Sequence, residues 1–255
     1  MQIPFYRVYL AEWQKTKFSW GLTLSILGPL AVSLIIILGF IQNADKADNA
    51  TNPWGDFAQI TFQFYFLLYP LFAALAAFLL CNIEHKNQGF KFIFTQAAPK
   101  YHFYLSKVLI LWTWITCSFL TAAVLLIVGG NLLGVIVPAY GFQEYTPNVI
   151  TWIFLVRLYI SLMGILAIHF FLSLYFDNFI ISIGAAVFLF VFGMSVFNQW
   201  DYDYLVPYTY PIQHFVEFRS GEGEWFSRET WISLIYMFVF LSGGYFLMTR
   251  KNISK

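Results

Sequence analysis

Six long apolar runs fill most of the 255-residue chain, and the stretches between and around them hold nearly all of its charges. Each run has 19 to 28 residues. As a helix rising about 1.5 Å per residue, that is enough to cross a hydrocarbon core of roughly 30 Å. Transmembrane strands would be shorter and would alternate in polarity. The pattern therefore predicts an all-α integral membrane protein with six transmembrane helices. The expected helices are Phe18–Ile41, Phe57–Cys81, Val108–Val128, Val149–Phe176, Phe179–Phe197 and Thr230–Met248.

Lysine and arginine gather on one side of this six-helix arrangement, although the net charge is only +1. The side that holds both chain ends carries Arg7, Lys15, Lys17, Lys86, Lys91, Lys100, Lys107, Arg250, Lys251 and Lys255. The other side carries Lys46, Arg219 and Arg228. The positive-inside rule then predicts that the N- and C-termini are both cytoplasmic.

The composition leaves no room for a sizeable soluble domain, because 60% of the residues are hydrophobic, 11% are charged and the mean hydropathy is +0.67. The polar stretches are too short to build cores of their own. We expect one transmembrane domain over residues 1–255. Three of its regions stand out: an interfacial helix in 1–17, a cytoplasmic loop in 83–107 and an external segment in 199–229.

The region before the first span has an aromatic residue at every fourth position, namely Phe5, Tyr9 and Trp13. This spacing predicts an amphipathic helix that lies in the cytoplasmic interface with its aromatic rings at headgroup depth. Such a helix could be a plain anchor for the first span. It could also be a surface on which a cytoplasmic partner pushes.

The cytoplasmic loop combines a basic surface with apolar residues spaced for one helix face, at Phe90, Ile93, Phe94 and Ala97. An interfacial helix docked on a partner protein has this pattern. A solvated loop that merely follows the positive-inside rule has it too, so periodicity alone leaves both interpretations open.

The external segment between the fifth and sixth spans contains nine aromatic residues, interrupted by Pro207 and Pro211. Tryptophan and tyrosine favour the membrane interface, so we expect this segment to dip into the outer interface. We predict a gate or substrate-contact surface there. Nucleic acid is not an expected partner, because little basic charge accompanies the rings. The candidate residues are Tyr204, Pro207, Tyr208, Tyr210 and Pro211.

Two local features carry further expectations. Gly129-Gly130 is expected to end the third helix, followed by a partly embedded apolar piece over 132–137. Arg157 is the one full charge well inside a predicted span, about eight residues or roughly 12 Å from its outer end. It could serve a subunit interface or a transport pathway. It could also simply snorkel to the interface.

Familiar catalytic motifs are absent from the sequence, which contains no G-x-x-x-x-G-K-[ST], no G-x-S-x-G and no H-E-x-x-H. The chain therefore has no phosphate loop for ATP, and we expect no catalytic residue, no metal site and no cofactor of its own. The four histidines, His85, His102, His169 and His214, are scattered along the chain. Nothing in their spacing predicts that they converge.

Three stretches carry a resemblance to a known family. Glu84, Lys86-Asn87, Lys91, Pro99 and Lys107, directly after a second span, resemble the first cytoplasmic loop of ABC-2-type transporter permeases. Leu10–Lys17, with Glu12, Trp13 and Lys15, is similar to that family's N-terminal interfacial helix. Tyr204–Pro211 resembles the external segment of the branch associated with lantibiotic immunity and antimicrobial-peptide export.

The resemblance implies a permease subunit that is not an enzyme by itself and works with a separate ATP-binding cassette subunit, which holds ATP and Mg²⁺. The loop after the second span would be a coupling helix seated on the ATPase, through Glu84, Lys86, Lys91, Phe94 and Pro99. A second permease chain, identical or similar, is implied. The resemblance further implies a bacterial plasma membrane, contact with membrane lipid, and export of a hydrophobic or amphipathic antimicrobial peptide, lipid or drug.

Two other classes compete with this interpretation. An intramembrane lipid-modifying enzyme needs polar catalytic groups that converge at one depth, and Arg157, His169 and a few glutamines do not supply a convincing set. A non-catalytic membrane partner or sensor is the other alternative. An ATP-binding protein that co-purifies with the chain would distinguish a permease from both.

Overall fold

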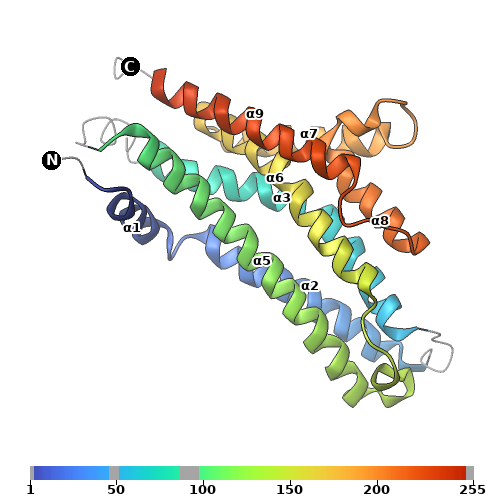
Figure 1. Cartoon of the computed structure of the whole chain (residues 1–255). Helices are drawn as coiled ribbons and strands as arrows, with labels where there is room; N and C mark the ends of the chain where they lie inside the picture. The colour runs from blue at the N-terminus through green and yellow to red at the C-terminus, as the bar shows by residue number, and fades with distance from the viewer. Residues whose placement is uncertain (1–2, 46–51, 87–97, 251–255) are drawn as a thin grey trace.

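The computed structural model describes residues 3–45, 52–86 and 98–250 (Figure 1). Within these residues, six helices are long and apolar enough to cross a membrane, which confirms the predicted fold class. They are α2 (Trp20–Gln42), α3 (Pro53–Lys86), α5 (Lys100–Ile136), α6 (Val149–Tyr175), α7 (Phe179–Val196) and α9 (Arg228–Arg250).

The helix α1 (Phe5–Thr16) and the last turn of α9 lie at the same end of the bundle (Figure 1). This end, which the positive-inside rule assigns to the cytoplasm, is called the inner end below, and the opposite one the outer end. The helix α3 extends beyond its predicted run at both ends, and α5 begins eight residues before and ends eight residues after its predicted run.

The buried side of α1 differs from the aromatic stripe that the sequence suggested. Val8, Glu12 and Thr16 are its buried residues, and α1 packs mainly against α5. Trp13 is half-buried against the core, whereas Tyr6 is 57% exposed. The buried face of α1 is therefore the stripe of Val8, Glu12 and Thr16, and the predicted aromatic stripe of Phe5, Tyr9 and Trp13 is half-buried beside it.

The helix α6 lies at the centre of the bundle and packs along α9 and α3, while α2 packs along α5. The contact between α6 and α9 is close because Gly164 has no side chain. Its backbone N–H donates to Ser233 Oγ at 3.1 Å, and Ser233 Oγ donates to the carbonyl of Ser161 at 2.8 Å. Small and hydroxyl residues bring membrane helices together in this way.

The expected end of the third span at Gly129-Gly130 is wrong, because α5 continues as a helix to Ile136. Both glycines lie under aromatic rings of α3. A Cβ at Gly130 would lie 2.5 Å from the Trp54 ring, and one at Gly129 would lie 2.8 Å from Phe57. The glycine pair therefore allows two helices to approach and does not break α5.

The connection from α5 to α6 closes the outer end through two short 3₁₀ turns, Pro138–Tyr140 and Phe142–Glu144. The Tyr140 hydroxyl donates to the carbonyls of Phe40 and Asn43, at 3.1 and 2.9 Å. The Trp54 indole donates to the carbonyl of Phe142 at 2.9 Å. These bonds fix the outer ends of α2 and α3 to the connection.

The external segment folds back onto the helices. It contains two 3₁₀ turns, Asp203–Leu205 and Pro207–Thr209, followed by the helix α8 (Tyr210–Ser220). The second turn packs against α7 and α6, and α8 packs against α6 and α3. Phe215 of α8 stacks on Phe66 of α3, with ring centroids 4.9 Å apart.

Candidate functional site

Four charged side chains meet at the inner end and form the inner charge cluster: Glu12, Lys15, Glu84 and Lys107. Lys107 Nζ lies 2.6 Å from Glu12 Oε2 and 3.0 Å from Glu84 Oε1. Lys15 Nζ lies 2.6 Å from Glu12 Oε1 and 3.1 Å from Glu84 Oε1. The cluster joins α1, the end of α3 and the start of α5, and its formal charges sum to zero.

Burial makes the inner charge cluster hard to break. The side chains of Lys107 and Glu12 are each 1% exposed and that of Glu84 is 4% exposed, whereas Lys15 is 41% exposed. Removing one member of a buried pair leaves an uncompensated charge in a low dielectric, which costs about 3–5 kcal/mol. Therefore α1, α3 and α5 are held in one relative position at this end.

Two further hydrogen bonds extend this connection to α6 and α9. His85, next to Glu84, contacts the carbonyl of Ser173 with Nε2 at 2.9 Å. Lys100, in the first turn of α5, donates from Nζ to the carbonyl of Thr249 at 3.1 Å. The two helix ends that flank residues 87–97 are thus bonded to α1, α6 and α9.

The structure separates the residues predicted to couple to an ATPase. Lys86 is exposed, and Pro99 is the residue that precedes α5. Glu84 is buried, so the expectation that it contacts a partner surface is corrected: its carboxylate is engaged by Lys107 and Lys15 inside the protein. Lys91 and Phe94 lie outside the described residues.

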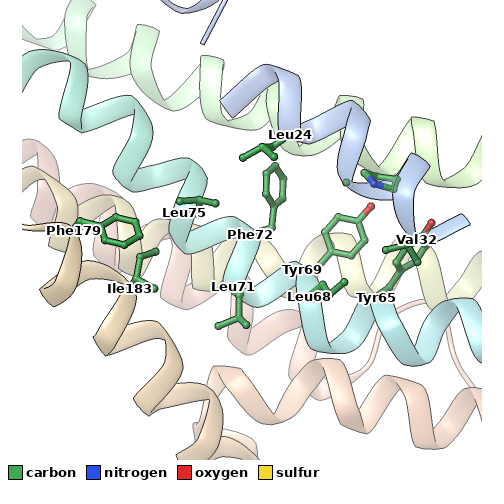
Figure 2. A pocket seen from close by; sticks show the side chains of 12 residues that line it. Leu24, Val32, Tyr65, Leu68, Tyr69, Leu71, Phe72, Leu75, Phe179 and Ile183 are labelled. Carbon is green, nitrogen blue, oxygen red and sulfur yellow. The ribbon is translucent and has the colours of Figure 1, made fainter. Parts of the chain in front are cut away.

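An apolar groove of about 330 Å³ runs between α2, α3 and α7. Figure 2 shows Phe72 of α3 pointing toward Leu24 of α2, with Phe179 and Ile183 of α7 beyond Leu75. None of the described residues that line it is charged. The groove is lined by Leu24, Gly28, Pro29, Val32, Tyr65, Leu68, Tyr69, Leu71, Phe72, Leu75, Phe179 and Ile183.

A second hollow of about 380 Å³ lies between the outer parts of α2 and α3. It is lined by Ile36 and Phe40 of α2, by Ile60 and Phe64 of α3, and by Tyr140. The two hollows follow the same pair of helices from the inner half toward the outer end. They are two separate hollows with no described lining residue in common.

Polar side chains of α6 pair with the external segment in a series that is called the α6 ladder below. Arg157 forms an ion pair with Glu217, and His169 contacts the Tyr208 hydroxyl. Ser161 Oγ lies 2.7 Å from Nε2 of His214. Arg157 is 2% exposed, so the snorkelling interpretation is wrong. The histidines do not converge, since His169 and His214 join α6 and the external segment at different levels, with separate partners.

The Ser161–His214 contact has the geometry of a nucleophile beside a base, but the rest of a catalytic arrangement is missing from the described residues. His214 Nδ1 has no hydrogen-bond partner among them, so no third group orients the imidazole. Burial and the nearby Arg157 hold the pKa of His214 well below its usual value. Ser161 and His214 are 0% and 1% exposed, which leaves a substrate no access.

The predicted gate residues are mostly inside the protein. Pro207, Tyr208, Tyr210 and Pro211 are buried, and the Tyr210 hydroxyl donates to the carbonyl of Tyr204 at 2.8 Å. In this conformation they form the packing of the external segment and do not face a passing substrate. Burial against α6 and α7 encloses the rings in this conformation, and their role as a gate or substrate-contact surface stays a prediction.

Comparison with known families identifies the chain. A family model described as ABC-2 family transporter protein matches residues 9–193. The chain belongs to the ABC-2 transporter family. The match includes the inner charge cluster and the apolar groove, and it ends within α7, before the external segment. No curated protein and no solved structure matches the chain.

Family membership supports a multi-pass permease subunit of an ABC transporter, and it implies an ATP-binding cassette partner. The match does not distinguish the lantibiotic-immunity branch from others. The described residues contain no group of three or more His, Cys, Asp or Glu side chains that could hold a metal ion.

Proposed function

We propose that this ABC-2 permease uses ATP hydrolysis by a separate ATPase to export a hydrophobic or amphipathic molecule. The observation that carries the proposal is the inner charge cluster, which joins α1 to the helix ends flanking residues 87–97. Those residues contain the predicted coupling positions Lys91 and Phe94. ATP and Mg²⁺ would be bound by the partner, because this chain has no phosphate loop.

The cluster supports this role because it is buried and joins α1, α3 and α5. A push on residues 87–97 acts first on the end of α3 and the start of α5. Since Glu84 and Lys107 are bonded to each other and to Glu12, the interfacial helix must move with both spans. The bonds of His85 and Lys100 pass the same displacement to α6 and α9. Packed helices respond to such a push as bodies that shift together.

The apolar groove supports the substrate class. Its described lining has aliphatic and aromatic side chains with the hydroxyls of Tyr65 and Tyr69, and no charge, so it suits an acyl chain or apolar peptide side chains. An antimicrobial peptide, a lipid or a drug meets this requirement. A second permease chain placed against α2, α3 and α7 would cover the groove and turn it into an enclosed path. The location we propose is a bacterial plasma membrane.

The test compares insertion of the chain into the membrane with its coupling to the ATPase. Lys91→Glu and Phe94→Asp are expected to keep the chain in the membrane but to lower ATPase co-purification, or to leave hydrolysis unresponsive to the permease. Lys255→Glu, also predicted to be cytoplasmic, serves as the matched charge control. Normal co-purification and normal stimulated hydrolysis in both loop variants would refute the coupling role of residues 87–97.

A further inference from the structure

The α6 ladder joins α6 to the external segment in reversed order. The α6 members of the ladder are, in chain order, Arg157, Ser161 and His169, and their respective partners are Glu217, His214 and Tyr208. The contacts extend over twelve residues of α6, or roughly 18 Å of helix. The external segment therefore lies antiparallel to α6 and is held at each level by a specific polar contact.

The contacts leave several buried polar atoms unsatisfied. Nε of Arg157 and Nδ1 of both His169 and His214 have no hydrogen-bond partner among the described residues. A buried polar network that is only partly satisfied is costly, because each unpaired group has lost its water. An undocked state in which water reaches these atoms regains that loss. The ladder contacts therefore favour the docked state, and the unpaired buried atoms favour the undocked state.

The chain has backbone features suited to pivoting at both ends of this segment. Asn198, between α7 and the first 3₁₀ turn, has a positive φ of 54°. Gly221 and Gly223, after α8, have φ values of 75° and 155°. A Cβ at Gly223 would lie 3.4 Å from Nη1 of Arg157, so this turn folds over the ion pair. Changes of φ and ψ at a few such positions are what hinge motions require.

We propose that Arg157 and Glu217 are positioning residues that latch the external segment onto α6. Release of this ion pair lets the segment pivot at Asn198 and Gly221 and opens the outer end of the bundle. The Glu217 side chain, at 23% exposed, is the most exposed member of the α6 ladder, so its carboxylate is the part of the ladder closest to water. The role of the movement in export rests on the proposed function. The docking itself does not, because it can be measured without the ATPase.

The test measures exposure of a residue of the external segment that is buried in the docked state. Thr209 is 2% exposed and similar in size to cysteine, so Thr209→Cys is the reporter, in a chain carrying Cys81→Ala and Cys117→Ala. An impermeant maleimide is applied to the outer side of membrane vesicles. Glu217→Gln keeps the side-chain shape and removes the charge. Glu224→Gln, at an exposed position of the same segment, is the matched control.

We expect slow labelling of Thr209→Cys in the parent, and labelling at least about tenfold faster with Glu217→Gln, because Arg157 then loses its charged partner. Glu224→Gln should leave the rate unchanged. The exchange of charges in Arg157→Glu with Glu217→Arg should return the rate toward that of the parent, which a general loss of folding would not do. Rapid labelling in the parent, an unchanged rate in Glu217→Gln, or no recovery in the exchanged pair would each overturn the latch.

Export then separates the latch from the proposed function. A variant that labels quickly and still assembles with the ATPase is expected to hydrolyse ATP with little export. If the labelling results hold but export is unaffected, the latch stands and its assignment to the outer gate fails. If no variant of this chain affects export of any hydrophobic dye, the proposed function fails independently of the latch.

Discussion

Nζ of Lys107 lies 2.6 Å from Oε2 of Glu12, a residue 95 positions earlier in the chain. Both side chains are 1% exposed. The ammonium group sits between two carboxylates, since Glu84 contacts it as well at 3.0 Å. This one cation therefore determines how the interfacial helix, the second span and the third span are placed at the inner end.

Removing that cation should be far more damaging than removing its exposed neighbour. Lys107→Met leaves Glu12 and Glu84 buried together with Lys15 alone, and we expect a loss of about 3–5 kcal/mol in the free energy of unfolding. Lys15→Met should cost about 1 kcal/mol or less, because Lys15 is 41% exposed and screened by water. Unfolding in mixed detergent micelles, followed by circular dichroism, compares the two. Equal losses would contradict the central role of Lys107.

The orientation of the chain is open to a direct experiment. The positive-inside rule predicts that cysteine introduced at Asn49 or Glu222 labels from outside intact cells. Cysteine at Asn87 or Ser254 should label only after the membrane is made permeable. Labelling of the Asn87→Cys variant from outside would reverse the assignment of inner and outer ends, and the coupling proposal would be lost with it.

The apolar groove offers a matched pair of glycines for testing the cargo path. A Cβ at Gly28 or at Gly184 meets no atom within 4 Å, and of the two only Gly28 lines the groove. Gly28→Leu should fill the groove without disturbing the fold and reduce export by roughly tenfold or more, as misfit in an apolar pocket does. Gly184→Leu should leave export intact. Export of a fluorescent hydrophobic dye, at equal amounts of protein, gives the comparison, and equal export by both variants would exclude the groove as the path.

The six spans could be predicted because the thickness of the bilayer fixes the length of an apolar helix. Local glycine rules failed at Gly129-Gly130, where the glycines accommodate Trp54 and Phe57 from another helix. That packing is a tertiary feature, and no local pattern signals it. The same limit applies to Tyr208 and Tyr210, whose interfacial character is clear from sequence and whose burial is not.

The candidate site was partly visible in the sequence. The family resemblance singles out Glu12, Lys15, Glu84 and Lys107, but no pattern in the sequence predicts that these four residues pair. No sequence signal predicts the pairing of Arg157 with Glu217 either, because sixty residues and the helix α7 separate them. It depends on the external segment folding back onto α6, which polar and aromatic composition alone does not specify.

The docking of the external segment should depend on pH through His214. His214 contacts Ser161 and lies near Arg157, both on α6. Glu217 on its own helix pairs with that arginine, and α8 packs on α3 through the ring pairs Phe215–Phe66 and Phe218–Phe62. Burial and Arg157 hold its pKa well below its usual value while the segment is docked. Undocking returns the imidazole to water, where its pKa is about 6.5.

The direction of the pH effect depends on whether the docked or the undocked state binds a proton at His214 more readily. At pH 7.5 neither state is protonated at His214, so docking is unaffected; at pH 5.5 only the undocked state takes up a proton, which favours undocking by about tenfold. The rate of maleimide labelling at Thr209→Cys, divided by that at the exposed Val216→Cys to remove the intrinsic pH dependence of thiols, should therefore rise about tenfold between these pH values. The variant His214→Gln, which can still hydrogen-bond Ser161, should abolish the rise. A ratio that stays constant with pH in the parent, or that rises equally in His214→Gln, would show that this histidine does not control docking.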